Sequence, residues 1–507
     1  MSLRIYNTLT RRIDEFKPLV DNEVRIYTCG PTVYDYAHIG NYRTFVFQDI
    51  LRRHLEYLGY KIRQVMNLTD VDDNTIRNSI AAGVSLRDYT AKYIREFEVD
   101  CELLSLEKPE ISVRATDHIA DMVKLIQVLL DKGYAYAADG SVYFRVAAFK
   151  DYGKLANLDL SGIRPGARVD TDKYDKTDAR DFVLWKAAKP GEPFWEAPFG
   201  PGRPGWHIEC SVMSMKYLGP SFDIHSGGVD LVFPHHENEI AQSEAATGKS
   251  FVRYWLHADH LIVNGEKMSK SLGNYYTLRD LIAKGYRPSA IRYLLASVPF
   301  RKPLNFTFEG LHQAQQSIER LRNFRYRLTK ESFPAGENPE SQVRAQRGRQ
   351  AFEAALDDNL NTAEALAAAF ELVREGNTAM DHGEFRDGDR GAFLDMLERW
   401  DRIFAVLEDT DHAKLLEHGF VKAVTAASSD SVADARPDGG QGQVGAGASS
   451  ALAVESLTNE AIEQRIVERD AARRRGEYSR SDQIREDLLK AGVILEDTKA
   501  GTRWKRK

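Results

Sequence analysis

The stretch that decides the fold runs from residue 23 to residue 74 and reads "EVRIYTCGPTVYDYAHIGNYRTFVFQDILRRHLEYLGYKIRQVMNLTDVDDN". Residues 23–30 are rich in β-branched and aromatic side chains and are followed by a proline, which predicts a buried strand. Residues 45–58 carry apolar side chains near helical spacing and precede a glycine, which predicts a helix. Residues 61–74 return to a strand pattern that ends in acids. This strand–turn–helix–strand unit is the building block of a parallel nucleotide-binding sheet.

Ligands of such a sheet bind at the carboxyl ends of its strands. Cys29, His38 and Asp70 lie at or just after the ends of predicted strands, so we expect them to converge there. The strand pattern returns in "FDIHSGG" (222–228) and in "YWLHADHLIVNG" (254–265), which predicts further strands of the same sheet.

Length and composition are those of an ordinary globular protein, because 507 residues provide for roughly three domains. The formal net charge of -6 gives no sign of a nucleic-acid partner, although a local basic patch remains compatible with it. We find neither a signal-peptide pattern at the start nor an apolar run of about 18 residues, so no membrane span is expected. The three scattered cysteines make a disulfide framework improbable and favour the reducing cytoplasm.

Further along the chain the patterns divide it into parts. Residues from about 115 to 205 have the character of an insertion, and from about residue 307 apolar stripes predict helices. The Ser/Gly/Ala-rich segment 424–456 cannot bury enough apolar surface to fold, which predicts a flexible linker. A compact tail with two basic clusters follows it.

A candidate metal site begins in "FPHHENEIAQSEAA" (233–246), where Pro234 is expected at the first helical position. His235 and Glu239 are four residues apart and would project from one helical face. Together with Cys29 and Cys210 they form a plausible tetrahedral zinc site of two thiolates, an imidazole and a carboxylate.

The alternatives for these residues are a solvated helix start and buried structural cysteines. The latter is the interpretation we prefer for Cys101. A metalloprotease is disfavoured, because Ile240 stands where the second histidine of its helical motif is needed.

Two short motifs point to a phosphate ligand. "HIGN" (38–41) at a strand-to-helix turn offers an imidazole, a helix amino terminus and a glycine that lets a ligand approach the backbone. "GEKMSKSLGN" (265–274) is a loop with two lysines and flanking glycines, which could close over a polyphosphate. A solvated basic loop is the alternative for the second motif.

Four long motifs occur in a fixed order: "CGPTVYD" (29–35), "GRPGWHIECS" (202–211), "FDIHSGGVDLVFPHHENEIAQSEA" (222–245) and "EKMSKSLGN" (266–274). With "HIGN", they make the chain resemble the cysteinyl-tRNA synthetase family, within the class I aminoacyl-tRNA synthetases. The resemblance extends from the first residues to the final "LEDTKAGTRW" (495–504).

The resemblance implies an α/β fold with a Rossmann-type parallel-sheet catalytic domain, an inserted connective domain, a helical bundle and a small anticodon-binding module. The expected ranges are the catalytic domain in two halves (1–115 and 205–275), the connective insertion (116–204), a stem-contact region (276–310), a tRNA-binding helical bundle (311–423), the linker (424–456) and the C-terminal module (457–507).

For the reaction, the resemblance implies that L-cysteine is activated with ATP to cysteinyl-adenylate and transferred to the 3′ end of tRNA(Cys). It places one Zn²⁺ on Cys29, Cys210, His235 and Glu239, where the ion selects the substrate thiol and Mg²⁺ accompanies ATP. His38, Asn41, Lys267 and Lys270 are the expected catalytic residues, and these four with Gly40 are expected to bind ATP. Asn41 departs from the family, because many class I members have a second histidine there; its amide can still donate a hydrogen bond.

Further contacts are implied for the amino acid and for tRNA. Trp206, Asp230, Thr69 and Asp70 are expected to bind cysteine, although the last two could equally be caps of a turn or helix. In the tail, the residues expected to contact tRNA are Arg473, Arg474, Arg475 and Trp504, with a solvated terminus as the alternative. A monomer is the family expectation.

Two other functions stay open at this point. A ligase that joins cysteine to glucosaminyl-inositol would share the catalytic domain and zinc site, but such relatives lack a long C-terminal part. A zinc-dependent nucleotide-binding protein without catalysis is disfavoured by the two intact motifs with both lysines.

Overall fold

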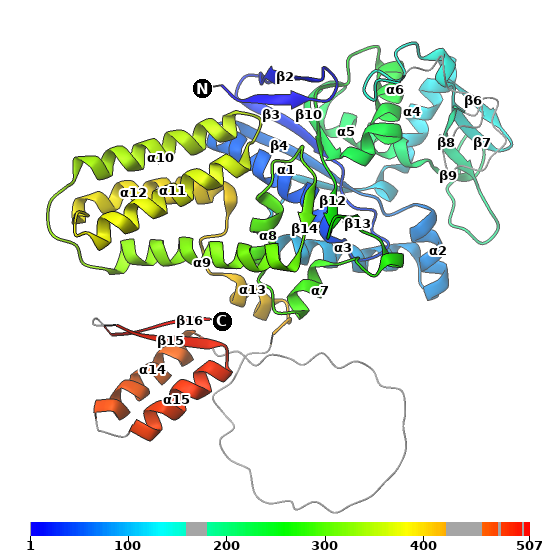
Figure 1. Cartoon of the computed structure of the whole chain (residues 1–507). Coiled ribbons are helices and arrows are strands. Elements are labelled where there is room, and N and C mark those ends of the chain that lie inside the picture. Colours follow the sequence, from blue (N-terminus) through cyan, green and yellow to red (C-terminus); the bar gives the residue numbers. More distant parts are fainter. Residues whose placement is uncertain (1, 159–179, 422–458, 475–477, 499–500, 507) are drawn as a thin grey trace, which may run out of the picture. The chain divides into compact units, whose positions relative to one another are not determined.

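The computed structural model describes residues 2–158, 180–421, 459–474, 478–498 and 501–506 (Figure 1). The chain forms two units, residues 1–408 and residues 409–507. The predicted flexible linker (424–456) and Arg475 lie outside the described residues.

The centre of the first unit is a five-stranded parallel sheet with the strand order β11–β10–β3–β4–β5. The strands β3 (Glu23–Thr28) and β4 (Lys61–Leu68) are joined by the long helix α1 (Ile39–Tyr57), as the sequence pattern predicts. The remaining strands are β5 (Ile111–Arg114), β10 (Phe222–Gly228) and β11 (Val252–Ala258). This topology confirms the predicted Rossmann-type α/β fold.

Helix α1 begins where the sequence supplies a cap. The backbone N–H of Asn41 donates to His38 Nδ1 at 3.1 Å, and the backbone N–H of His38 donates to Asn41 Oδ1 at 3.1 Å. This reciprocal capping box satisfies two free donors at the start of the helix. The "HIGN" turn therefore stabilises the helix and presents its amino terminus at the carboxyl end of β3.

The segment between β5 and β10 carries a second sheet of four antiparallel strands (Figure 1). Its strands are β6 (Ala135–Ala138), β7 (Ser141–Phe144), β8 (Phe182–Ala187) and β9 (Gly202–Pro204). Helix α4 (Ile119–Asp131) precedes it, and α5 (Trp206–Leu218) leads back into the central sheet at β10. The aromatic rings of this sheet, among them Phe144 and Phe182, share one apolar core with α4, α5 and α6 (Glu237–Thr247).

Further helices and strands of the first unit complete the region of the central sheet. They are the hairpin β1 (Arg4–Asn7) and β2 (Arg12–Glu15), the helices α2 (Asp73–Ala82), α3 (Leu86–Leu103), α7 (Leu278–Ala283) and α8 (Pro288–Ala296), and the three-stranded sheet of β12 (Leu261–Val263), β13 (Glu266–Lys267) and β14 (Leu304–Phe306).

From Phe308 onward the first unit is helical, as the apolar stripes predict. Helices α9 (Phe308–Lys330), α10 (Pro339–Asp357), α11 (Thr362–Asp381) and α12 (Arg390–Phe404) lie side by side (Figure 1). Arg292 of α8 ties them to the sheet region, because its buried guanidinium donates to Phe404 O and to Leu104 O, the second at 3.0 Å. A carboxylate on α1, that of Asp49, pairs with the same guanidinium.

The second unit contains α13 (Asp411–Glu417) and, after the undescribed segment, α14 (Asn459–Arg474), α15 (Tyr478–Lys490) and the hairpin β15 (Val493–Thr498) and β16 (Gly501–Arg506). Ile462, Ile484 and Val493 belong to its small apolar core. A compact C-terminal fold is thus present, as the tail sequence predicts.

The helix predicted to start at Pro234 follows one extended residue, Phe233. Phe233 has extended backbone angles (φ -140°, ψ 133°), because a residue before proline is sterically kept out of the helical region. From Pro234 the backbone is helical, first as a π-helical turn up to His236 and then as the regular helix α6 from Glu237. His235 and Glu239 lie on the same side of this helix start, with His235 Nε2 3.0 Å from Glu239 Oε1.

Candidate active site

A pocket of about 580 Å³ opens at the carboxyl ends of the central strands. Its lining comes from segments far apart in the sequence: the turn after β3, the start of α1, the start of α5, the segment after β10, and the chain from β11 through β13. The candidate site residues among its lining are Cys29, His38, Gly40, Asn41, Trp206, Cys210, Asp230, His235 and Lys267. Of the three residues predicted to converge at this edge, Cys29 and His38 line the pocket, and Asp70 is not among its lining.

Three residues of this lining meet the fully buried Glu239 in a group that we call the donor cluster: Cys29, Cys210, His235 and Glu239. One ligand atom from each lies within 4.8 Å of the other three. All four residues are buried, with Glu239 fully so. Cys210 and Glu239 come together because helix α5, which carries Cys210, packs against helix α6, which carries Glu239.

Burial and neighbouring charge shape the protonation of the donor cluster. Burial raises the pKa of Cys29, and it raises that of Cys210 well above its usual value. Burial also acts to raise the pKa of Glu239, but the nearby charges of His225 and His235 lower it to about 2. A cation bound among these groups would stabilise both thiolates, since a metal ion deprotonates a coordinating thiol. The chemistry of the donor set therefore fits a soft divalent metal.

Two histidines that the sequence analysis missed lie against the donor cluster. His225 Nε2 lies 2.9 Å from Glu239 Oε2, and His236 Nε2 lies 3.3 Å from Cys29 Sγ. A third histidine extends this series of side-chain contacts, because His236 Nδ1 lies 2.8 Å from His257 Nε2. Burial lowers the pKa of both His236 and His257, which keeps these rings neutral and suited to orienting the donors.

His225 and His236 form a second possible quartet with Cys29 and Glu239. Neither of these histidines lines the pocket, whereas Cys210 and His235 do. A metal held by the donor cluster would face the pocket, and one held by the alternative quartet would be turned away from it. Both histidines are visible in the motifs "FDIHSGG" and "PHHEN". The sequence alone, however, does not show which side chain a buried histidine contacts.

At the start of α1, the His38 ring faces the pocket with a defined tautomer. Because His38 Nδ1 accepts a hydrogen bond from the backbone of Asn41, the proton of the neutral ring is on Nε2. Burial lowers the pKa of His38, which favours that neutral ring. Asn41 uses its carbonyl oxygen in the capping box, so its NH₂ group is the part that can reach a ligand.

Gly40, between His38 and Asn41, has no room for a side chain. A Cβ at Gly40 would lie 2.9 Å from the His38 ring and 3.2 Å from Met268 Cε. The "HIGN" turn thus meets the loop that contains Met268, and Lys267 of that loop lines the same pocket.

Lys270 lies apart from this arrangement. Its Nζ is 2.7 Å from Asp35 Oδ2 and 5.0 Å from the centre of the Tyr275 ring. The hydrogen bond that Lys270 donates to the Asp35 carboxylate raises the pKa of the lysine. Among the residues described for the pocket lining, Lys267 is included and Lys270 is not. The second lysine of the loop is therefore held outside the pocket by an exposed ion pair.

Two predicted cysteine-binding residues lie in the pocket and two lie beside it. The Trp206 ring lies over the donor cluster, with its centroid 4.0 Å from that of His235, and Asp230 also lines the pocket. Asp70 accepts from the backbone and the hydroxyl of Thr116, at 2.9 and 2.6 Å. The Thr69 hydroxyl donates to Glu209 at 3.2 Å. Both residues are buried, and neither belongs to the described pocket lining.

Comparison with known proteins fits this geometry. A family model described as "tRNA synthetases class I (C) catalytic domain" matches residues 15–316, and one described as "DALR domain" matches residues 351–408. A protein of Solibacter usitatus named "Cysteine--tRNA ligase" is 54% identical over 100% of both chains. A protein of the same name from Koribacter versatilis is 53% identical over 100% of both chains.

The chain belongs to the cysteine–tRNA ligase family.

Members of this family are ligases, and solved class I synthetases share the fold. Mycobacterium tuberculosis methionyl-tRNA synthetase, in complex with methionyl-adenylate, has a TM-score of 0.57 at 16% identity, covering 78% of this chain and 93% of that chain. A leucyl-tRNA synthetase of Agrobacterium radiobacter has a TM-score of 0.56 at 11% identity, covering 77% and 85%. Identities this low establish a common fold and no more.

Two further findings on this cysteine–tRNA ligase family member concern membrane spans and the residues predicted to contact tRNA. Within the described residues, every helix is too short or too polar to cross a bilayer. In the second unit, Arg473 is exposed near the end of α14, which also contains Arg474. Trp504 of β16 packs on the small core, and its Nε1 donates to Glu463 Oε1 at 2.7 Å.

Proposed function

We propose that this chain activates L-cysteine with ATP and transfers the cysteinyl group to the 3′ end of tRNA(Cys), with a zinc ion selecting the thiol. One observation carries the proposal. The same pocket is lined by three members of the donor cluster and by the phosphate-facing residues His38 and Lys267. An amino acid held at the cluster would therefore lie beside a nucleotide held at the start of α1.

The first chemical step forms a bond between the cysteine carboxylate and the α-phosphorus of ATP, and pyrophosphate leaves. Negative charge grows on phosphoryl oxygens during this step, so donors aimed at those oxygens are the main catalytic device. His38 Nε2–H, the Asn41 NH₂ group and the Lys267 ammonium are the donors that we assign to it. The free N–H groups at the start of α1 add a positive partial charge, and Mg²⁺ accompanies ATP.

We assign a separate role to Lys270, because it lies outside the pocket lining. We assign it to the departing pyrophosphate, which would require that it leaves Asp35 and turns toward the pocket. An exposed ion pair contributes at most about 1 kcal/mol, so the phosphate charge can readily compete for the lysine. Loop closure of this kind places the full set of donors only when ATP is bound.

The donor cluster supports the selection of cysteine. Zinc held there supplies a soft Lewis acid that prefers a thiolate to the hydroxyl of serine. Cys29, Cys210, His235 and Glu239 would hold the ion, while His225 orients Glu239 from behind. A site built around one such interaction rejects an analogue that lacks it by a factor of about 10⁴.

The remaining predicted contacts are part of the same proposal. Trp206 forms a wall over the cluster, and Asp230 offers a carboxylate for the substrate amino group. Thr69 and Asp70 would act from beside the pocket, by fixing the strand end that carries its lining. For tRNA we propose contacts from Arg473, Arg474, Arg475 and Trp504, in a monomer located in the cytoplasm.

The test is aminoacylation of total tRNA with cysteine and ATP, run in parallel with serine. The account predicts charging with cysteine and almost none with serine. Glucosaminyl-inositol offered as the acceptor separates the alternative ligase, since a chain of that activity would use it and leave tRNA uncharged. The DALR domain at residues 351–408 favours the tRNA acceptor.

A further inference from the structure

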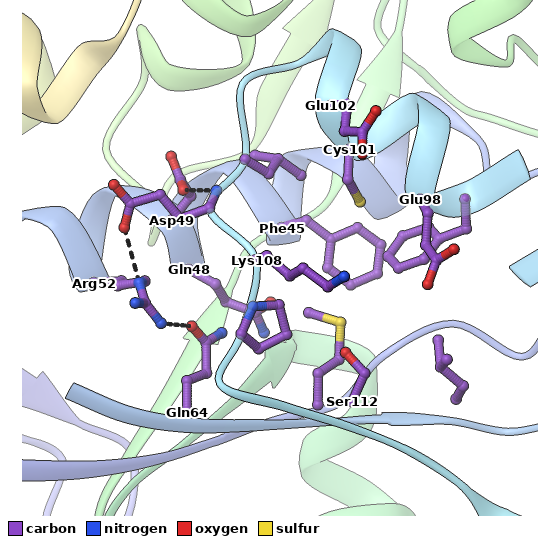
Figure 2. Close-up of a pocket in the computed structure, with 16 residues that line it drawn as sticks. Phe45, Gln48, Asp49, Arg52, Gln64, Glu98, Cys101, Glu102, Lys108 and Ser112 are labelled. Carbon is purple, nitrogen blue, oxygen red and sulfur yellow. Dashed lines mark hydrogen bonds and ion pairs between the residues drawn. The ribbon is translucent and has the colours of Figure 1, made fainter. Parts of the chain in front are cut away.

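A second pocket lies behind the catalytic pocket, on another part of α1. It has a volume of about 130 Å³ and is formed by α1, α3, β4 and the segment 106–112 (Figure 2). Its walls are mainly apolar, with Phe45, Met66, Phe97 and Leu106 among them. The charged side chains Glu98, Glu102 and Lys108 are exposed and belong to its rim.

The size of this pocket limits what can fill it. An apolar cavity of about 150 Å³ is sufficient for a molecule such as benzene. The walls contain two phenyl rings, and aromatic rings prefer offset or edge-to-face contact with another ring. A single planar ring is therefore the occupant that the walls favour.

One polar atom in the wall has no partner. Gln48 is 3% exposed, and its Nε2 donates to Ser226 O at 3.3 Å and to Ser226 Oγ at 3.2 Å. A carbonyl oxygen only accepts, so the amide nitrogen faces Ser226 and Oε1 is left on the other side. Among the residues that the structure describes, Gln48 Oε1 has no hydrogen-bond partner. Figure 2 shows this side chain extending from α1 toward the space between Phe45 and Gln64.

Three other polar residues of the wall, Arg52, Gln64 and Asp49, have hydrogen-bond partners within the protein. Arg52 Nη1 donates to Gln64 Oε1 at 3.1 Å, and Gln64 Nε2 donates to Thr28 Oγ1 at 3.3 Å. Asp49 accepts from the backbone N–H of Glu107 at 2.7 Å and pairs with Arg292. An occupant thus meets one buried acceptor, and buried polar groups in proteins normally have a partner.

We propose that this pocket is a ligand site of its own, which takes a small aromatic molecule with a single O–H or N–H donor directed at Gln48 Oε1. This site is distinct from the catalytic pocket, although Phe45 lines both. Cys101 lines it from α3 and is half-buried, whereas we predict a buried structural cysteine at this position from the sequence.

The test uses two probes of nearly equal shape, 4-fluorophenol and 4-fluorotoluene, with binding followed by fluorine NMR on the full chain. The phenol donates a hydrogen bond and the toluene does not. We expect the phenol to bind about tenfold more tightly, and Gln48→Leu to abolish that preference. Equal binding of the two probes to the unaltered chain, or binding of neither because water alone fills the pocket, would overturn the proposal.

Two further variants keep the test decisive. Cys101→Phe fills the pocket from the half-buried α3 position and should remove the binding of both probes, even where Gln48→Leu does not fold. Trp206→Ala alters only the catalytic pocket and should leave the preference unchanged. Loss of phenol binding in Trp206→Ala would place the probe in the catalytic pocket and contradict the proposal.

Discussion

The donor cluster and the lysine loop (residues 265–274) serve one pocket and are built in opposite ways. The cluster is enclosed: its members are buried, and histidines at 2.9 and 3.3 Å hold Glu239 and Cys29 from behind. The loop is open, with Leu272 59% exposed and the Lys270 side chain 63% exposed.

This difference follows from the two tasks. Choosing between a thiol and a hydroxyl needs fixed donors, because a loose site accepts both. Stabilising a phosphate that changes charge during the reaction needs groups that arrive with the nucleotide. We therefore infer that the cluster is preorganised and that the loop is completed by ATP, so that substitutions in the two regions should differ in their effects.

The largest effect is expected at the cluster. Cys210→Ser removes a soft ligand, so bound zinc should be lost and kcat/KM for cysteine in ATP–pyrophosphate exchange should fall by about 10⁴. Zinc is measured by elemental analysis of the purified protein. Cys101→Ser is the matched control, since it replaces the same chemistry outside the cluster and should retain the metal. Full zinc and full activity in Cys210→Ser would remove this residue from the site.

The next effect is expected at the loop. Lys270→Ala should lower kcat of ATP–pyrophosphate exchange by about 10²–10³, because one donor to the developing phosphate charge is lost. Its zinc content should stay at the level of the unaltered chain, which separates the loop from the cluster. Lys249→Ala alters an exposed lysine away from the pocket and should behave as the parent. An unchanged exchange rate in Lys270→Ala would contradict the assignment.

A smaller effect is expected behind the cluster. His225→Gln should weaken zinc affinity by about 10–100-fold, since outer partners orient the ligands of a metal. The measurement is competition with a chelator of known affinity. His312→Gln, an exposed position on α9, is the control. An affinity equal to that of the control would mean that Glu239 needs no support from His225.

The smallest effect concerns the ion pair that holds Lys270. Asp35→Asn should raise exchange at low ATP by no more than about fivefold, because an exposed pair contributes at most about 1 kcal/mol. Initial rates at subsaturating ATP measure it. A loss of activity as large as that of Lys270→Ala would show instead that Asp35 takes part in the reaction.

Much of this site follows from the sequence, for a physical reason. Cys29, His38 and Lys267 lie in motifs whose backbone geometry is local: a strand end, a capped helix start and a short loop. Glycine requirements at such turns are local as well, as at Gly40 beside the His38 ring. The α/β fold and the donor cluster could therefore be predicted from residue type and spacing together with the family resemblance.

What the sequence did not reveal depends on contacts between distant segments. His225 supports Glu239 only because β10 passes beside α6, and no local pattern encodes that approach. The pocket at Gln48 likewise needs α1, α3 and β4 together. The π-helical turn that precedes the regular helix at Glu237 is likewise not visible in periodicity alone.

The most direct test of the central claim is absorption spectroscopy of the chain loaded with Co²⁺ in place of zinc. The account predicts that free cysteine adds a thiolate-to-cobalt charge-transfer band and that serine at the same concentration adds none. A spectrum unchanged by cysteine, or changed equally by serine, would contradict the claim that Cys29, Cys210, His235 and Glu239 hold an ion that recognises the substrate thiol.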